Sequence, residues 1–100
     1  MKHSLSYSEE TRLYILMSLR CPRRCHGISD YIEQATGGQV KPGAGTVYNA
    51  VSQMRRRNII TVYDNRDCGT VYELTDLGRS ILHREAERIS RLHSFMGLEN

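Results

Sequence analysis

KPGAGTVYNAVSQMRRR, residues 41–57, is the stretch of sequence that decides the fold. Its Pro-Gly-Ala-Gly opening predicts a turn. Val47, Val51 and Met54 follow at positions i, i+4 and i+7, which predicts the apolar stripe of a short amphipathic helix. The opposite face carries small or amide side chains and one guanidinium, from Thr46, Asn49, Ser52, Gln53 and Arg56.

This polar face differs from an ordinary solvated one, on which Glu and Lys would be usual. From Gln34 to Tyr63 the chain has no carboxylate, but it has Lys41 and the run Arg55–Arg57. Amide and hydroxyl side chains suit the donors and acceptors of DNA base edges, and cations suit the phosphates. We therefore interpret residues 41–57 as a helix that enters a DNA groove.

Length and composition limit the number of domains, the location and the kind of partner that the chain can have. One hundred residues with 39% hydrophobic side chains predict a single domain with a modest core, for which dimerisation is a source of extra stability. No segment approaches the roughly 18 apolar residues of a membrane span, and the first ten residues lack a signal-type apolar run. The sequence thus predicts a cytoplasmic protein without a membrane partner. The net charge of +3 permits a polyanionic partner without demanding one.

The three cysteines, Cys21, Cys25 and Cys68, are an odd number in a chain without a signal peptide, which favours reduced thiols. The spacing C-x3-C between Cys21 and Cys25 is not that of a zinc ribbon. We expect no metal and no cofactor. A redox-sensing regulator that uses these thiols remains an alternative.

Two helices are expected before the central stretch. The first carries Leu13, Leu16 and Met17 and ends at Cys21-Pro22, because the residue before a proline disfavours helical dihedrals. The second starts near Cys25 or Gly27 and ends at a glycine pair that suits a left-handed cap, Gly37-Gly38. With the central helix, these elements predict a helix-turn-helix.

The pattern then changes to a period of two. Residues 59–63 and 70–74 predict two strands of a β-hairpin, with a turn-forming loop at 64–69. Thr75 is expected to cap a final helix of about five turns. The apolar stripe of this helix is longer than one small domain needs, so it predicts a dimer interface shared with the first helix. The expected interface residues are Leu13, Leu16, Ile81, Ile89, Leu92, Phe95 and Met96.

Three strings, in the right order, resemble the PadR family of winged-helix transcriptional regulators in its short form. HGISDYI (26–32) is similar to the family's His-Gly-Tyr-Glu-Ile opening of the second helix. KPGAGTVYNAVSQMRRRNII (41–60) is similar to its Pro-Gly-Thr-Leu-Tyr-Pro-Ala-Leu recognition helix, and VYELTDLGRSIL (71–82) to its Tyr-Arg-Leu-Thr-Glu-x-Gly wing end. The chain departs from the family pattern at two positions. Asn49 stands where the family usually has proline, and Asn58 stands where the family has glycine. The chain also lacks the family's basic second wing strand and has no tryptophan.

The resemblance implies an α+β, mostly α fold: a winged helix-turn-helix of three helices and a β-hairpin wing, followed by a long C-terminal dimerisation helix. The expected division is a DNA-binding domain at 1–74 and the dimerisation helix at 75–100. The implied function is that of a sequence-specific repressor that binds a palindromic operator in double-stranded DNA as a homodimer. An unidentified small-molecule effector is a further candidate partner.

The DNA-binding prediction extends to named residues. Thr46 and Asn49, near the start of the helix, are expected to reach base edges, while Lys41, Arg56 and Arg66 are expected at phosphates. The complete predicted set is Lys41, Gly45, Thr46, Tyr48, Asn49, Ser52, Arg56 and Arg66. Tyr48 has the alternative of a plain core tyrosine.

An enzyme is not expected, because the sequence has no Gly-rich phosphate loop, no His-Glu-x-x-His and no nucleophile elbow, and no catalytic residue is predicted. A winged helix used for protein–protein assembly remains the other alternative, favoured by the missing basic wing.

Overall fold

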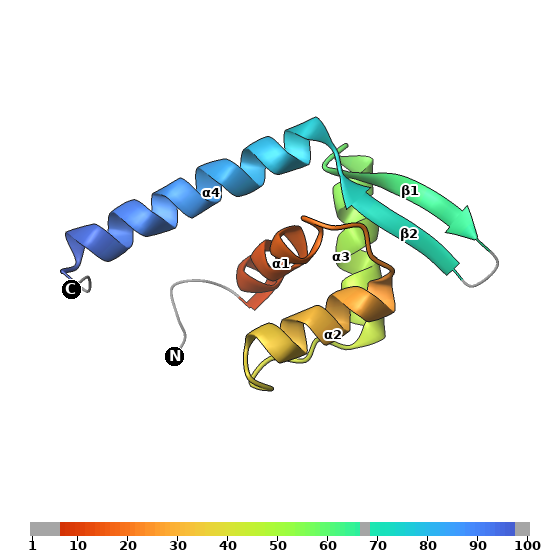
Figure 1. Cartoon of the computed structure of the whole chain (residues 1–100), viewed down its shortest axis with the longest axis horizontal. Helices are drawn as coiled ribbons and strands as arrows, with labels where there is room; N and C mark the ends of the chain where they lie inside the picture. Colours follow the sequence, from red (N-terminus) through yellow and green to blue (C-terminus); the bar gives the residue numbers. More distant parts are fainter. Residues whose placement is uncertain (1–6, 67–68, 98–100) are drawn as a thin grey trace.

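The computed structural model describes residues 7–66 and 69–97, which form four helices and one antiparallel hairpin (Figure 1). The fold is the predicted winged helix-turn-helix, mostly helical, with a long final helix. In chain order the elements are α1 (Tyr7–Ser18), α2 (Cys25–Ala35), α3 (Ala44–Arg56), β1 (Ile60–Arg66), β2 (Gly69–Leu74) and α4 (Asp76–Phe95).

The connector between α2 and α3 is fixed by the cap at the end of α2 and by a buried hydrogen bond. The glycine pair after α2 takes positive φ as predicted, and Gly38 N–H donates to Glu33 O at 2.7 Å. Ser29, buried in α2, donates through Oγ to Pro42 O at 2.8 Å. The connector is thereby fixed at both ends, so α3 leaves it at a defined angle to α2.

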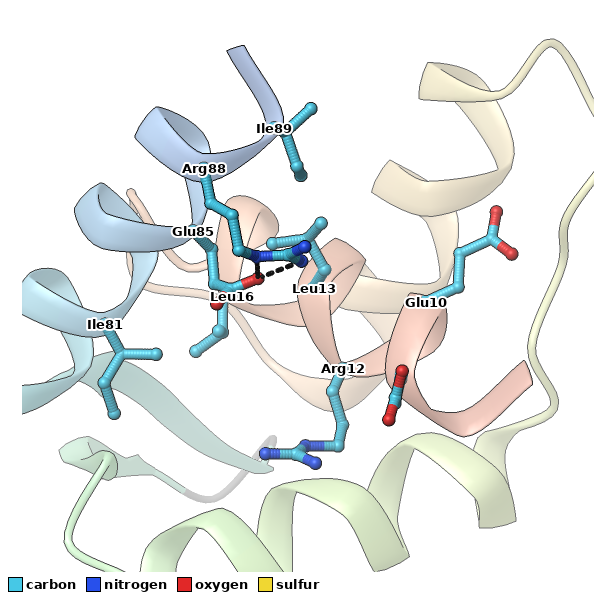
Figure 2. Close-up of a pocket in the computed structure, with 9 residues that line it drawn as sticks. Glu10, Arg12, Leu13, Leu16, Ile81, Glu85, Arg88 and Ile89 are labelled. Carbon is cyan, nitrogen blue, oxygen red and sulfur yellow. Dashed lines mark hydrogen bonds and ion pairs between the residues drawn. The ribbon is translucent and has the colours of Figure 1, made fainter. Parts of the chain in front are cut away.

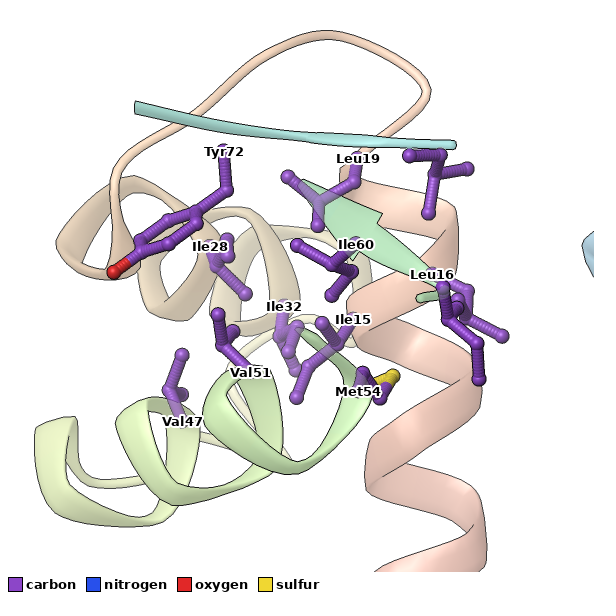
Figure 3. Packing of buried hydrophobic residues seen from close by; sticks show 12 residues of the cluster. Ile15, Leu16, Leu19, Ile28, Ile32, Val47, Val51, Met54, Ile60 and Tyr72 are labelled. Atoms are coloured by element: carbon purple, nitrogen blue, oxygen red, sulfur yellow. The ribbon is translucent and has the colours of Figure 1, made fainter. Parts of the chain in front are cut away.

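The core lies where α1, α2, α3 and the hairpin meet (Figure 3). The stripe Val47, Val51 and Met54 faces inward as predicted and is at most 2% exposed. Tyr72 and Leu74 share the inner face of β2, which confirms the alternation read from the sequence. The remaining buried hydrophobic residues are Ile15, Leu16, Leu19, Ile28, Ile32, Ile59 and Ile60.

The wing is longer than the predicted hairpin. Strand β1 runs to Arg66 and pairs there with Gly69, so residues 64–66, expected in the loop, belong to the ladder. Propensity favoured a turn there, but cross-strand pairing decided the outcome. The register shifts between Val62 and Asp64, which leaves Tyr63 at a β-bulge.

Helix α4 begins at the cap that the sequence predicted, because Thr75 Oγ1 accepts a hydrogen bond from Gly78 N–H at 3.0 Å. Its first turns pack on the body through Ile81 and Leu82. It then extends past α1, and every residue from 86 to 97 is exposed (Figure 1). The helix is therefore longer than the core of one chain requires.

Candidate nucleic-acid interface

Most of the outer face of α3 is open to solvent. Val47 and Val51 are fully buried on the inner face, while Tyr48 is 58% exposed and Thr46 and Asn49 are also exposed. Within the described residues, none of these three outer side chains forms a hydrogen bond or an ion pair with another residue. The helix thus presents unpaired donors and acceptors on a ready-made α-helical surface, which fits the width of a DNA major groove.

Ser52 and Gly45 complete the predicted α3 set with different geometry. Ser52 is half-buried, so its hydroxyl reaches outward less than the Asn49 amide does. Gly45 is exposed and has open space around the position of a Cβ. A bare backbone at this position allows a close approach by another surface.

Tyr48 is a surface residue, which decides against the core alternative. It lines a groove of about 300 Å³ with residues from the start of α2 and the start of β2: Arg24, Cys25, His26, Gly69, Thr70 and Tyr72. Arg24 and Thr70 were not among the predicted contacts. The adjacent pair Arg23-Arg24 was a visible signal, but only the folded chain brings the wing beside Tyr48.

The arginine run at the end of α3 divides into two roles. Arg55 lies over the ring of Tyr72, with its guanidinium carbon 5.9 Å from the ring centroid. Arg56 and Arg57 are exposed, and neither forms an ion pair with any residue in the described part of the chain. Arg56 lies in the last turn of α3 and Arg57 is its C-cap, and the helix dipole favours cations at this end. Arg56 is the predicted phosphate contact.

Lys41 has an acidic partner that the carboxylate-free stretch did not reveal. Its Nζ lies 2.8 Å from Glu33 Oε1, across the connector from α2. This hydrogen bond and the charge of Glu33 raise the pKa of Lys41 above its ordinary value. Lys41 stays protonated but its charge is offset, so a phosphate would have to compete with Glu33.

The wing carries the predicted contact Arg66 and also an exposed tyrosine that was not predicted, Tyr63. Arg66 ends β1, and its side chain lies outside the described residues, as does Cys68. Tyr63 is 58% exposed at the β-bulge, a device that re-aims a side chain. The sequence pattern predicts a strand at Tyr63 but does not reveal the bulge.

The predicted dimer surface is spread over α1 and α4. Ile89, Leu92, Phe95 and Met96 are exposed large hydrophobic residues, and Phe95 reaches 88%. Leu13 and Ile81 are half-buried between the helices. Leu16 differs from the expectation: it is 6% exposed, because α1 turns this side into the core cluster of its own chain.

A pocket of about 320 Å³ lies between α1 and α4 (Figure 2). Leu13, Ile81 and Ile89 form its apolar walls. Arg88 donates to Glu85 Oε1 through both Nε and Nη2, at 3.2 and 2.7 Å, and this bond lowers the pKa of Glu85. The pocket combines an apolar wall with an ion pair, at the place where α1 and α4 meet.

The thiols and carboxylates do not assemble a centre in the described residues. No three His, Cys, Asp or Glu side chains there come close enough to hold a metal ion. Cys21 is exposed, while burial raises the pKa of Cys25, which leaves less thiolate to react. No helix in residues 7–66 and 69–97 is long and apolar enough to span a bilayer.

Sequence comparison identifies a family. A model described as "Transcriptional regulator PadR-like family" matches residues 13–84, which include the helix-turn-helix, the wing and the first half of α4. A comparison with curated protein sequences found no match.

Solved structures share the fold at low identity. A transcriptional regulator from Clostridium thermocellum superposes with a TM-score of 0.76 at 17% identity, over 94% of this chain and 96% of that one. A PadR family transcription regulator from Clostridium difficile gives 0.71 at 19% identity, over 88% and 95%. Bacillus subtilis PadR in complex with operator DNA gives 0.67 at 21% identity, over 75% of this chain and 45% of that one.

Proposed function

Because the chain belongs to the PadR-like family of transcriptional regulators, we propose that it represses transcription by binding double-stranded DNA as a homodimer. Helix α3 is the recognition helix, and the operator is a palindrome with half-sites about one helical turn apart. The proposed DNA-binding part comprises residues 1–74, and the proposed dimerisation part comprises residues 75–100, which include α4. The observation that carries this proposal is the open, carboxylate-free outer face of α3.

The two ends of α3 have separate tasks in this proposal. Thr46 and Asn49, near its start, read base edges, and the Asn49 amide suits the paired donor and acceptor of adenine. Arg56 at its end, Lys41 before its start and Arg66 on the wing neutralise phosphates, which positions the protein without specifying sequence. Tyr48 and Thr70 line the groove beside α3, where a backbone phosphate would meet two hydroxyl groups.

Dimerisation uses the distal half of α4. Ile89, Leu92, Phe95 and Met96 are exposed on a helix that extends beyond the core of its own chain. Large exposed apolar side chains that gather in one region are typical of association surfaces. A second copy that covers them would place two α3 helices on one face of a duplex.

The effector site in this proposal lies between α1 and α4. The pocket with the Glu85–Arg88 pair lies at this junction (Figure 2), so a ligand there would change how α4 sits on the body. Such a change would alter the distance between the recognition helices.

Selection from a pool of random-sequence duplexes tests the proposed function. The full-length chain should enrich an inverted repeat whose half-sites lie about one turn apart. A reporter gene behind the enriched sequence should be silenced by the wild type and released by Asn49→Ala. Failure to enrich any sequence would contradict the proposal, and increased expression with the wild type would contradict repression.

A further inference from the structure

The end of α3 and the start of α4 share hydrogen-bonding groups. Helix α3 ends in a Schellman motif, in which Asn58 N–H donates to Arg55 O and Ile59 N–H donates to Met54 O, both at 2.9 Å. Asn58 occupies the left-handed position with φ of 64°. The carbonyl groups of Asn58 and Ile59 then face the chain where it enters α4.

Thr75 binds both of these carbonyl groups. Its Oγ1 lies 2.7 Å from Asn58 O and 3.0 Å from Ile59 O, and its N–H donates to Ile59 O at 3.0 Å. The same Oγ1 accepts from Gly78 N–H. A hydroxyl has one proton to donate and two lone pairs, so a single side chain can cap α4 and hold the exit of α3 at once.

Gly78 allows the close approach on which this contact depends. A Cβ at Gly78 would overlap the carbonyl oxygen of Ile59 and lie 3.2 Å from Leu74 Cδ2. Both neighbours are buried core residues, so neither can move away at little cost. Only glycine lets the first turn of α4 lie directly on the backbone that follows α3.

A small rotation of α4 at this contact would move the far end of the helix by several ångströms. Twenty residues of α4 span about 30 Å, so a rotation of about 10° at its start would move its far end by about 5 Å. The rise of one base pair is about 3.4 Å. The angle fixed at this contact therefore decides between neighbouring half-site spacings if α4 joins the two subunits.

We propose that Thr75 and Gly78 are positioning residues that fix the angle between α4 and α3, and so set the half-site spacing that the dimer accepts. The inference rests on the proposed function for its DNA consequence. The rigid contact itself is a property of one chain and can be measured without DNA.

The first experiment measures the angle. Spin labels at Gln53 and Ser90, both exposed, are introduced into a full-length chain whose three cysteines are replaced by serine. The labelled chain is diluted with unlabelled chain so that only distances within a chain are recorded. Thr75→Asp keeps an N-cap acceptor but has no proton to donate to the carbonyls, so the distance should shift or its distribution should broaden. Thr75→Ser keeps the hydroxyl and should restore the wild-type distribution.

The second experiment measures spacing with the unlabelled protein. Duplexes carry two copies of the selected half-site, inverted, at spacings that differ by one base pair. The wild type and Thr75→Ser should prefer one spacing, while Thr75→Asp should lose or shift that preference. If the Gly78→Ala variant folds, it should lose or shift the spacing preference as Thr75→Asp does. If it does not fold, the Thr75 variants alone decide the test.

The outcomes separate the two proposals. An unchanged distance distribution in Thr75→Asp would overturn the rigid contact. A changed distribution with an unchanged spacing preference would overturn its role in spacing. If the wild type binds no duplex at all, the proposed function fails, and with it the spacing role, while the spin-label distances still decide whether the contact is rigid.

Discussion

Glu33 holds Lys41 through an ion pair of 2.8 Å between Oε1 and Nζ, across the connector that leads into the recognition helix. The pair places a carboxylate beside a cation that the sequence alone had left free for DNA. In the folded chain, the carboxylate of Glu33 on α2 therefore partly neutralises the positive charge of Lys41 at the entrance to α3.

Glu33→Gln should raise affinity for DNA of any sequence and lower the pKa of Lys41 toward its ordinary value, because the carboxylate that raises it is removed. The Lys41 pKa can be followed by NMR, and affinity by titration at several salt concentrations. Glu87→Gln removes the same charge on distal α4 and should leave both unchanged. Weaker DNA binding by Glu33→Gln would show that the pair supports the interface.

Arg56→Ala should weaken binding about equally on all duplexes and lower the slope of log K against log salt by roughly one unit, because one phosphate contact is lost. Arg91→Ala removes an exposed cation of the same kind from α4 and serves as the control. A loss confined to the selected operator would instead assign Arg56 to base recognition.

Asn49→Ala should reduce the preference of the protein for its selected DNA site over unrelated DNA. Loss of a bidentate contact to a base costs about 1–3 kcal/mol on the selected site and little on unrelated DNA. Competition titrations with both duplexes measure the difference, and Gln34→Ala on α2 is the matched amide control. Equal losses on the two duplexes would remove Asn49 from the set of base-reading residues.

Leu92→Glu should dissociate the dimer. Leu92 is 47% exposed in the single chain, so covering it gains about half of the roughly 1.5–3 kcal/mol of full burial. The homodimer loses two copies, which together cost about 1.5–3 kcal/mol, so the dissociation constant should rise roughly ten- to a hundredfold. Sedimentation equilibrium measures it, and Arg91→Glu places the same carboxylate on the neighbouring position. If both variants remain dimeric, another surface joins the subunits.

Gly78→Ala should lower the free energy of unfolding by about 1–3 kcal/mol, because the added methyl group overlaps the Ile59 carbonyl in a packed region. Gly45→Ala meets open space and should leave stability unchanged or slightly raised. Urea denaturation followed by circular dichroism compares the two. Equal stabilities would mean that α4 adjusts at Gly78 without strain.

The sequence predicted the local features of this fold, because each one depends on neighbouring residues. The apolar stripe of α3, the glycine pair after α2 and the Thr75 cap all follow from spacings of a few residues. Features that join distant segments were missed. These include the Lys41–Glu33 pair, the groove that brings Arg24 and Thr70 beside Tyr48, and the backbone bridge between Arg23 and Tyr72.

In the candidate site too, features set by neighbouring residues were predicted and features set by distant segments were missed. Exposure of Thr46 and Asn49 follows from helical period alone, since they lie opposite Val47 and Val51. The bulge at Tyr63 depends on the register of the wing, which only cross-strand pairing fixes. The core position of Leu16 depends on how α1 packs, because α1 is apolar around most of its circumference.

A titration tests whether the protein binds specific DNA. The full-length chain is titrated at several salt concentrations with the DNA upstream of its own gene and with a scrambled duplex of the same composition. We expect tight binding that weakens steeply with salt and prefers the upstream DNA. Weak binding to both duplexes by a stable dimer would contradict it and would assign the outer face of α3 to a protein partner.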